Sequence, residues 1–417
     1  MIPFSRQSAI TFLLVLSAIN FADKAVIGLV ADTMSRDLHL SSAQWGLVGG
    51  SFYLLFSLAA LCGGVWSDRI GPKAVLALLG GVWAGIQLVT MWIVGFPLLL
   101  ASRILLGAAE GPFYGTAAHA LSKWLPPSKQ GMGMALVTLG SAAGPAVIAP
   151  LLSLLILYAG WRISFGVLGA LGLIWLLAWL ALREPRPVLN AAAPPPTAVP
   201  WKLVVKNFFT ARVLLLTFAG FAAYAYLSLL VVWVPAYWQQ ARHLAAGSPL
   251  YLLGVFLPWA CGGTLQVVLS WLADRLQKRS NAGRLIVLAG ALIVGAFLLV
   301  VAALTSVPLL AVLALSLMPI GVVFPLVAAS LTALAPRSVC GAIQGTSVAL
   351  YSLGAVLVPT IVGVLVQRLG ITQGFVWTWI SLAILLGVAA SALIVEGSRT
   401  PRTAPYPAFQ FTERTQF

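Results

Sequence analysis

The chain has 417 residues, a net charge of +15, 61% hydrophobic residues and only 8% charged residues. About a quarter of the residues in soluble domains are charged, so this composition excludes a soluble protein and indicates one embedded in a membrane. Apolar runs of about twenty residues, the length that crosses a bilayer as a helix, recur along the chain. They predict twelve spans, at roughly 9–31, 42–64, 74–95, 97–122, 132–158, 163–183, 210–236, 248–272, 284–305, 308–334, 341–367 and 371–395.

We interpret the first span as a retained helix and not a signal peptide, because no small-residue cleavage site follows a short apolar core.

Positive charge is distributed unequally between the two sides of the predicted spans. One side holds Arg36, Arg162, Arg242 and Arg368, whereas eighteen Lys and Arg residues fall on the side of the two termini. Cytoplasmic loops are the ones rich in Lys and Arg. We therefore expect a multi-pass protein of the plasma (inner) membrane with both termini cytoplasmic, and nucleic acid is not an expected partner.

Two charged residues, Asp23 and Lys24, interrupt the outer half of the first span. They could lie close enough to the membrane surface for their side chains to reach water. Apolar residues continue for two further turns, however, which favours a position at membrane depth. Charges at that depth are costly and normally face a protein interior or a wet cavity.

The fourth span, at 101–121, carries a second pair of charges, Arg103 and Glu110. Seven residues are two helical turns, so both side chains should lie on one face, about 10 Å apart along the axis. Gly107, Gly111 and Gly115 recur every four residues, a spacing that allows another helix to pack closely. Asp23, Lys24, Arg103 and Glu110 together predict a polar site inside the membrane.

The loop after the second span reads GGVWSDRIGPK. Its Gly64, Asp68, Arg69, Gly71 and Lys73 resemble the signature loop of the major facilitator superfamily. That resemblance implies that the acidic and basic residues latch the two halves of a transporter together in one conformation. The same pattern returns in degenerate form after the eighth span, at Asp274 and Arg275.

This repetition, with the proline-rich segment between the sixth and seventh spans, predicts an all-α integral membrane protein with two pseudo-symmetric six-helix bundles. We place the N-terminal bundle at 1–183, a cytoplasmic linker at 184–208, the C-terminal bundle at 209–395 and a cytoplasmic tail at 396–417. The sequence does not indicate an enzyme, since His39, His119 and His243 are scattered. Cys62, Cys261 and Cys340 lack the spacing of metal ligands, so we expect neither a metal nor a cofactor.

The four buried charges sum to zero, which makes the empty site tolerable. An incoming organic anion would be attracted to Arg103, whose planar fork suits a carboxylate, and to Lys24. The anion would also compete with Asp23 and Glu110 and so favour their protonation. Proton and anion would then bind cooperatively, which is the logic of a symporter.

The segments NFADK, RILLGAAEG and VWVPAYWQQARHL of the first, fourth and seventh spans resemble the anion:cation symporter branch of the same superfamily. That branch includes sugar-acid, tartrate, phthalate and sialic acid carriers. The resemblance implies that Asp23 and Glu110 carry protons, and that Lys24 and Arg103 meet the substrate carboxylate. The wider set of expected substrate contacts comprises Tyr53, Phe56, Tyr224, Trp233, Gln344, Ser347 and Ser352, although each aromatic residue taken singly could equally face lipid.

Three departures from that branch bear on the substrate. Lys24 replaces the usual arginine, Phe56 replaces a tyrosine, and Val348 and Ser352 stand where sugar-acid carriers tend to place asparagine. Fewer hydroxyl-binding groups favour an aromatic or short-chain carboxylate.

We therefore expect a monomer in the lipid bilayer that takes up a small organic carboxylate with protons by alternating access. One alternative is a proton-coupled antiporter that exports drugs or metabolites, which the GSAAGP segment of the fifth span suggests. A sensor or an enzyme scaffold is a third possibility, but the chain has no sizeable soluble domain.

Overall fold

The computed structural model describes residues 6–182, 201–336 and 339–399, and every regular element in these ranges is a helix. The N-terminal half contains α1 (Arg6–Leu29), α2 (Ala31–Asp37), α3 (Ser42–Ile70), α4 (Pro72–Thr90), α5 (Phe96–Glu110), α6 (Phe113–Trp124), α7 (Pro127–Ala159) and α8 (Trp161–Ala181). The C-terminal half contains α9 (Trp201–Phe208), α10 (Ala211–Val232), α11 (Val234–Ala236), η1 (Tyr237–Ala241), α12 (Pro249–Gln277), α13 (Gly283–Leu304), α14 (Pro308–Ser316), η2 (Pro319–Val322), α15 (Val323–Leu334), α16 (Cys340–Tyr351), α17 (Leu353–Leu369) and α18 (Ile371–Ser398).

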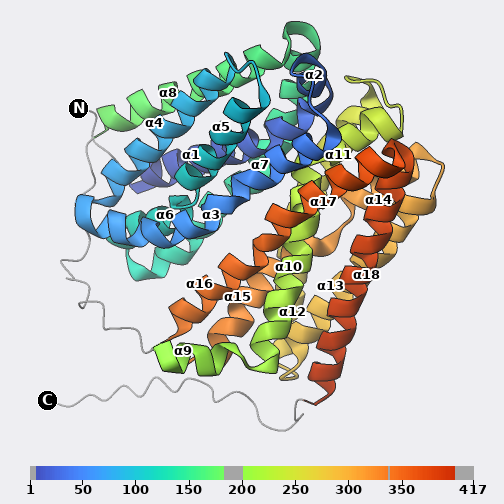
Figure 1. The fold of residues 1–417 in the computed structure, drawn as a ribbon. Coiled ribbons are helices and arrows are strands. Elements are labelled where there is room, and N and C mark those ends of the chain that lie inside the picture. The colour runs from blue at the N-terminus through green and yellow to red at the C-terminus, as the bar shows by residue number, and fades with distance from the viewer. Residues whose placement is uncertain (1–5, 183–200, 337–338, 400–417) are drawn as a thin grey trace, which may run out of the picture.

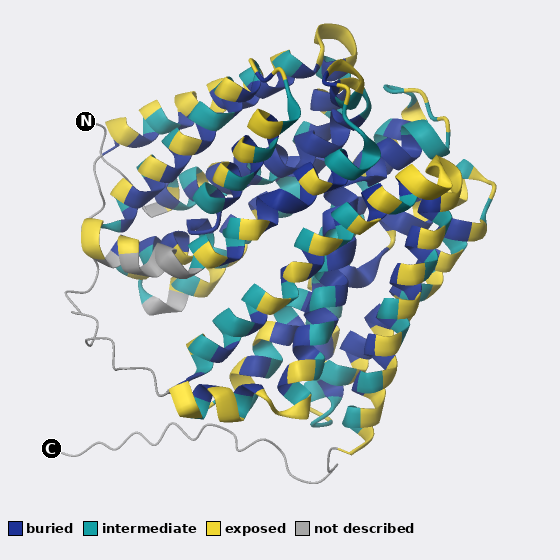
Figure 2. Cartoon of the chain, in the orientation of Figure 1, coloured by how far each residue is buried: buried dark blue, intermediate teal, exposed yellow. Residues whose placement is uncertain are grey.

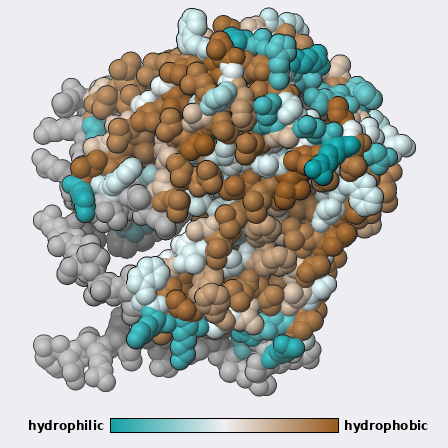
Figure 3. Space-filling view, in the orientation of Figure 1, coloured by the Kyte–Doolittle hydropathy of each residue, from teal (hydrophilic) through white to brown (hydrophobic). Residues whose placement is uncertain are grey.

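Twelve helical stretches within the described ranges are long and apolar enough to cross a membrane, which confirms the predicted number of spans. Their surface forms a broad hydrophobic band with hydrophilic side chains gathered towards its two ends (Figure 3). Buried residues line the inner faces of the helices and exposed residues follow their outer faces (Figure 2). A helix in a bilayer satisfies its own backbone hydrogen bonds, so its apolar outer face can meet lipid directly.

The fourth span is a single stretch, Phe96–Trp124, as the sequence suggested for 101–121, but it has a bend after Glu110. Helix α5 ends at Glu110, and α6 begins at Phe113 after Gly111 and Pro112. Proline has no N–H group for the preceding turn and its ring crowds that turn, so a helix breaks or bends there. Glu110 therefore stands at the end of a helical segment, next to the bend.

The two halves meet at one end of the molecule and separate towards the other (Figure 1). We call these the closed end and the open end. The closed end joins 42–50 of α3 to 356–363 of α17, and the start of α1 and the end of α18 lie at the open end. This contact between the halves requires α3 and α17 to approach each other closely.

Glycine makes the closed end tight. A Cβ atom added to Gly46 would lie 2.2 Å from the carbonyl oxygen of Pro359, and one added to Gly50 would lie 2.3 Å from that of Val356. On the opposite helix, a Cβ atom on Gly363 would lie 2.3 Å from the Ser42 carbonyl oxygen. Small residues at these positions let two backbones touch, so any larger side chain would force the halves apart.

Within the predicted linker, residues 201–208 form the short helix α9, which buries Val204 and Phe208. The rest of that linker, at 184–200, lies outside the described residues. At the other terminus, α18 continues to Ser398, three residues into the predicted tail, and residues 400–417 are not described.

Candidate functional site

Helix α1 carries three polar side chains into the interior of the N-terminal half. Asn20 and Asp23 are each 1% exposed and Lys24 is 7% exposed. The Lys24 ammonium donates to Asn20 Oδ1 at 2.5 Å, one helical turn earlier. The sequence allowed Lys24 either to reach water at the membrane surface or to lie at membrane depth. Its side chain takes the second position and points into the protein interior.

Helix α5 brings Arg103 and Glu110 to the same region, and each is 1% exposed. Gly107, midway between them, explains how a neighbouring helix can approach so closely. A Cβ atom on Gly107 would lie 1.7 Å from the Phe52 carbonyl oxygen of α3. The predicted packing role of Gly107 and the shared burial of the two charges thus have one cause, the close contact of α5 with α3.

Lys24 and Glu110, 86 positions apart in the chain, form a buried ion pair. The Lys24 ammonium also lies over three aromatic rings, 4.5 Å from the centroid of Phe21, 5.4 Å from Phe52 and 5.6 Å from Phe56. The negative faces of aromatic rings attract a cation, and more strongly away from water. A carboxylate, an amide and three rings therefore compensate the buried positive charge.

Arg103 is much less well compensated. Its Nε and Nη2 atoms are buried and have no hydrogen-bond partner among the described residues. Oδ1 of Asp23 and Oε1 of Glu110 are in the same condition, although Asp23 lies close enough to interact electrostatically with Arg103, Lys24 and Glu110. A buried polar atom without a partner costs about 1–3 kcal/mol, and a charged one more. The site is thus built to hydrogen-bond something beyond its own side chains.

A small cavity of about 10 Å³ lies beside Arg103 and Lys24. Its wall comes from both halves, with Tyr53 of α3 on one side and Val231 and Val232 of α10 on the other. This volume holds about one water molecule. A larger ligand at this position would require the two halves to move apart.

Aromatic side chains from both halves continue this wall. Tyr53 meets Tyr224 of α10 edge to face, with ring centroids 5.7 Å apart, and Tyr53 and Phe56 are 6.2 Å apart. Ser57 and Ser352 are joined by a hydrogen bond across the two halves. The structure thus gathers Lys24, Arg103, Tyr53, Phe56, Tyr224 and Ser352 of the expected substrate contacts around one region.

Gln344 and Ser347 make their hydrogen bonds within the C-terminal half. Gln344 donates to the Thr332 hydroxyl at 2.6 Å, and Ser347 accepts from the Thr217 hydroxyl at 3.0 Å. Neither residue lines the cavity beside Arg103. Their role as substrate contacts stays a prediction for a conformation in which the halves are arranged differently.

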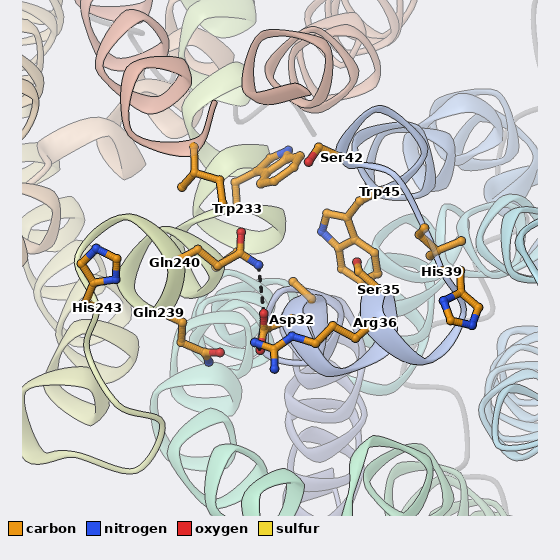
Figure 4. A pocket seen from close by; sticks show the side chains of 14 residues that line it. Asp32, Ser35, Arg36, His39, Ser42, Trp45, Trp233, Gln239, Gln240 and His243 are labelled. Carbon is orange, nitrogen blue, oxygen red and sulfur yellow. Dashed lines mark hydrogen bonds and ion pairs between the residues drawn. The ribbon is translucent and has the colours of Figure 1, made fainter. Parts of the chain in front are cut away.

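Trp233 lies at the closed end and does not line the small cavity beside Arg103. Its indole N–H donates to the Pro359 carbonyl oxygen at 3.1 Å, and it lines a separate cavity of about 750 Å³ (Figure 4). In that cavity Asp32 accepts from Arg36 at 2.5 Å and, across the halves, from Gln240 at 3.2 Å. Trp233 thus bonds within its own half, and its role as a substrate contact stays a prediction.

The predicted latch residues show contacts within their own halves. Lys73 donates to the carbonyl oxygen of Leu182 and accepts at its own carbonyl from Trp179, at 3.1 Å. Gly71 adopts a φ of +84° at the turn between α3 and α4, a conformation that favours glycine. Arg69 is exposed, whereas the side chains of Asp68 and of residues 61–65, including Gly64, lie outside the described part of the chain.

The second loop of this kind is arranged differently. Asp274 pairs with Arg284 at 3.1 Å, and the Arg275 guanidinium lies 5.2 Å from the Trp271 ring centroid. A latch between the halves stays a prediction for both loops.

Two residues near the charges are absent from the predicted site. Asn20 bonds to Lys24, and Gln87 of α4 is fully buried with both amide atoms lacking a hydrogen-bond partner among the described residues. Gln87 is near enough to Asp23 to interact with it. The sequence did offer a signal for both residues, because each is an amide side chain inside an apolar run. An amide is costly to bury unless it is hydrogen-bonded.

The family model of the Major Facilitator Superfamily matches residues 13–345. The chain belongs to this superfamily. The major facilitator fold is also found in solved structures that align along most of the chain. A bacterial homologue of the human lysosomal transporter Spinster, in an inward-facing and unoccupied conformation, has a TM-score of 0.75 at 17% identity, with 94% of this chain and 97% of the other covered. The D-xylose-proton symporter has a TM-score of 0.74 at 15% identity, with 96% and 100% covered.

Several curated major facilitator proteins with similar sequences are anion transporters. The hexuronate transporter of Bacillus subtilis is 27% identical over 66% of this chain and 67% of its own length. The D-galactonate transporter of Escherichia coli O6:H1 is 25% identical over 94% of this chain and 95% of its own length. A probable sulfoacetate transporter of Cupriavidus necator is 27% identical over 64% of each chain. Other matched relatives are covered over only about half of their length, for example 50% for a chloroplastic ascorbate transporter of Arabidopsis thaliana. The chain is thus a major facilitator protein whose sequence is similar to those of these transporters.

Proposed function

We propose that this protein is a secondary active transporter that takes up a small organic carboxylate together with protons by alternating access. The observation that carries the proposal is Arg103. Two of its guanidinium nitrogens are buried without a partner, beside a Lys24–Glu110 ion pair and at the junction of the two halves. A planar fork with free donors is the group best suited to hold a carboxylate by two hydrogen bonds.

The substrate would enter this site by exchange of partners. Its carboxylate would accept from Arg103 and draw on the positive charge of Lys24, which Glu110 holds when no substrate is bound. Glu110 would then be left as a buried carboxylate next to a second anion, and a buried charge without a partner is neutralised by proton binding. Proton binding at Glu110 and Asp23 would thus accompany anion binding.

This exchange couples the two ligands thermodynamically. If the anion raises the affinity for protons, protons must raise the affinity for the anion by the same factor. When the number of bound protons equals the negative charge of the substrate, the site keeps the neutral sum of Asp23, Lys24, Arg103 and Glu110. The protein could change conformation with the site either empty or fully loaded, because the site is neutral in both states. With only the anion or only the proton bound, the site would carry a buried net charge.

The class of substrate follows from the charge and from the lining. Hexuronate, D-galactonate and sulfoacetate, the substrates that name three of the relatives, are all organic anions. Phe52 and Tyr53 line the cavity beside Lys24 and Arg103, and the rings of Phe56 and Tyr224 lie next to Tyr53. These rings would pack well against an aromatic or short-chain carboxylate.

For the membrane, we propose a monomer in the plasma (inner) membrane with both termini in the cytoplasm. The support is the excess of Lys and Arg in the loops on that side. The closed end would then face outward and the open end the cytoplasm. The loops at Arg69 and Asp274 would latch the open end when it closes.

Purified protein in liposomes tests this proposal. An inward proton gradient should drive uptake of a carboxylate, and Asp23→Asn or Glu110→Gln should abolish the response to the gradient while counterflow of the carboxylate persists. Asp37→Asn is the matched control, because Asp37 is an acidic residue of the same half whose side chain is 44% exposed and pairs with Arg162. Full proton-driven uptake by both variants would refute the coupling roles, and proton-driven export would establish antiport instead.

A further inference from the structure

A second cavity, of about 760 Å³, lies far from the four charges in the C-terminal half. It is bounded by the N-terminal part of α13 and the last turns of α18, two helices that pack along each other. Its volume is within the range of sites that bind small molecules, about 300–1,000 Å³. We call it the α13–α18 groove.

The wall of the groove is aliphatic and faces outward. Ile286 and Ile293 of α13 are 56% and 47% exposed, and Ile394 of α18 is 51% exposed. Gly290 and Gly397 deepen the groove, because a Cβ atom added to either would meet nothing within 4 Å. In a membrane this surface meets hydrocarbon, so a lipid chain is the natural occupant of the groove.

The mouth of the groove has different chemistry. Arg279, which is exposed, lines it together with Ser280 and Ser398. Helix α13 begins beside them, and its Arg284 N–H already donates to the Gln277 side-chain oxygen at 3.0 Å. The Arg279 guanidinium is therefore the group at the mouth that favours a negative charge.

No acidic residue of the described C-terminal half is available to Arg279. Asp274 and Glu396 are the acids there, and they pair with Arg284 at 3.1 Å and with Arg212 at 2.9 Å. Other basic side chains lie at this end, namely Lys202, Lys206, Arg275, Lys278 and Arg399. The mouth of the groove therefore has positive charge that calls for an anion from outside the protein.

We propose that the α13–α18 groove binds an anionic phospholipid, with the phosphate at Arg279 and an acyl chain along Ile286, Gly290 and Ile293. A basic mouth above an aliphatic groove matches the two parts of such a lipid, whereas a free anion would use only the mouth. Basic pockets between helices at the cytoplasmic surface have this affinity for acidic head groups. This site does not depend on the proposed transport.

The test uses purified full-length protein freed of lipid, with phosphatidylglycerol or phosphatidylcholine added back and bound lipid counted by native mass spectrometry. Phosphatidylglycerol should be retained and phosphatidylcholine should not. Loss of one basic contact to an acidic head group weakens binding about fivefold, so Arg279→Gln should have this effect. Lys206→Gln removes a charge at the same end but outside the groove, and it should leave retention unchanged.

A second pair of variants tests the groove itself. Gly290→Leu would put a side chain into the groove from a position where a Cβ atom meets no protein atom within 4 Å, and it should displace the lipid. Gly387→Leu, at an equally open position of α18 outside the groove, should not. A phosphatidylglycerol with a photoreactive acyl chain should crosslink to 283–304 or 371–398. Equal losses in Arg279→Gln and Lys206→Gln, crosslinks confined to other helices, or full competition by inorganic phosphate would each overturn the proposal.

Discussion

Breaking the Lys24–Glu110 pair from one side should destabilise the protein more than removing both charges together. Lys24→Met keeps the length of the side chain and removes its charge. Glu110, whose side chain is 0% exposed, then remains as a buried carboxylate without this partner. Loss of one member of a buried ion pair costs about 3–5 kcal/mol, mainly because the other charge stays unpaired.

Glu110→Gln perturbs the pair from the other side, with a different expected magnitude. The amide keeps the shape of Glu110 and its oxygen can still accept from the Lys24 ammonium. Lys24 also retains Asn20 at 2.5 Å and the ring of Phe21 at 4.5 Å, so the loss should lie at the lower end of this range. Combining Lys24→Met with Glu110→Gln leaves Asp23 and Arg103 as balanced charges and should recover part of the stability.

The assay is the free energy of unfolding of the four proteins in mixed micelles, combined as a double-mutant cycle. Residues in contact should show a coupling of at least about 1 kcal/mol. The control cycle is Asp32→Asn with Arg36→Gln, where the Arg36 side chain is 77% exposed and the coupling should be well below about 1 kcal/mol. Additive losses at Lys24 and Glu110, equal to the control, would refute the inference that these charges depend on each other.

Three further outcomes are expected. Gly50→Leu should weaken the closed end, since its Cβ atom would lie 2.3 Å from a backbone oxygen; thiol labelling of a Gln239→Cys reporter in the closed-end cavity should become faster, and unchanged labelling would contradict the packing argument. The Arg162 guanidinium and the Trp161 indole donate to Asp37 and hold the pKa of that carboxyl below its usual value, so the pair stabilises the fold above about pH 4 and less as the pH falls through the lowered pKa. Asp37→Asn should therefore cost up to about 1 kcal/mol at pH 7 and nothing at the acid limit; a loss that is the same at both pH values would exclude the pair as its cause. Arg103→Lys should raise KM for the carboxylate about tenfold, because a point charge replaces a two-pronged donor, and an unchanged KM would remove Arg103 from the site.

Glycine and proline were only partly informative in the sequence. The spacing of Gly107, Gly111 and Gly115 indicated close packing. The structure confirms it at Gly107 and Gly111, with Cβ positions 1.7 Å and 2.2 Å from backbone oxygens of α3, whereas Gly115 is exposed. Pro112 was visible too, but its effect on the fourth span depended on the turn before it, where α5 ends at Glu110. A proline inside a membrane helix can be accommodated or can break it, according to what neighbouring helices supply to the freed backbone groups.

By itself, the sequence determined the number of spans and the identity of the buried charges. A bilayer requires about twenty apolar residues per helix and makes each charge among them costly, so both features can be read without any knowledge of packing. Only the tertiary structure decided the partners: Lys24 reaches Glu110, Gln87 lies next to Asp23, and Trp233 bonds to the Pro359 carbonyl oxygen. Helical periodicity orders side chains around one helix, but the rotation of that helix and its neighbours are set by the packing of all the others.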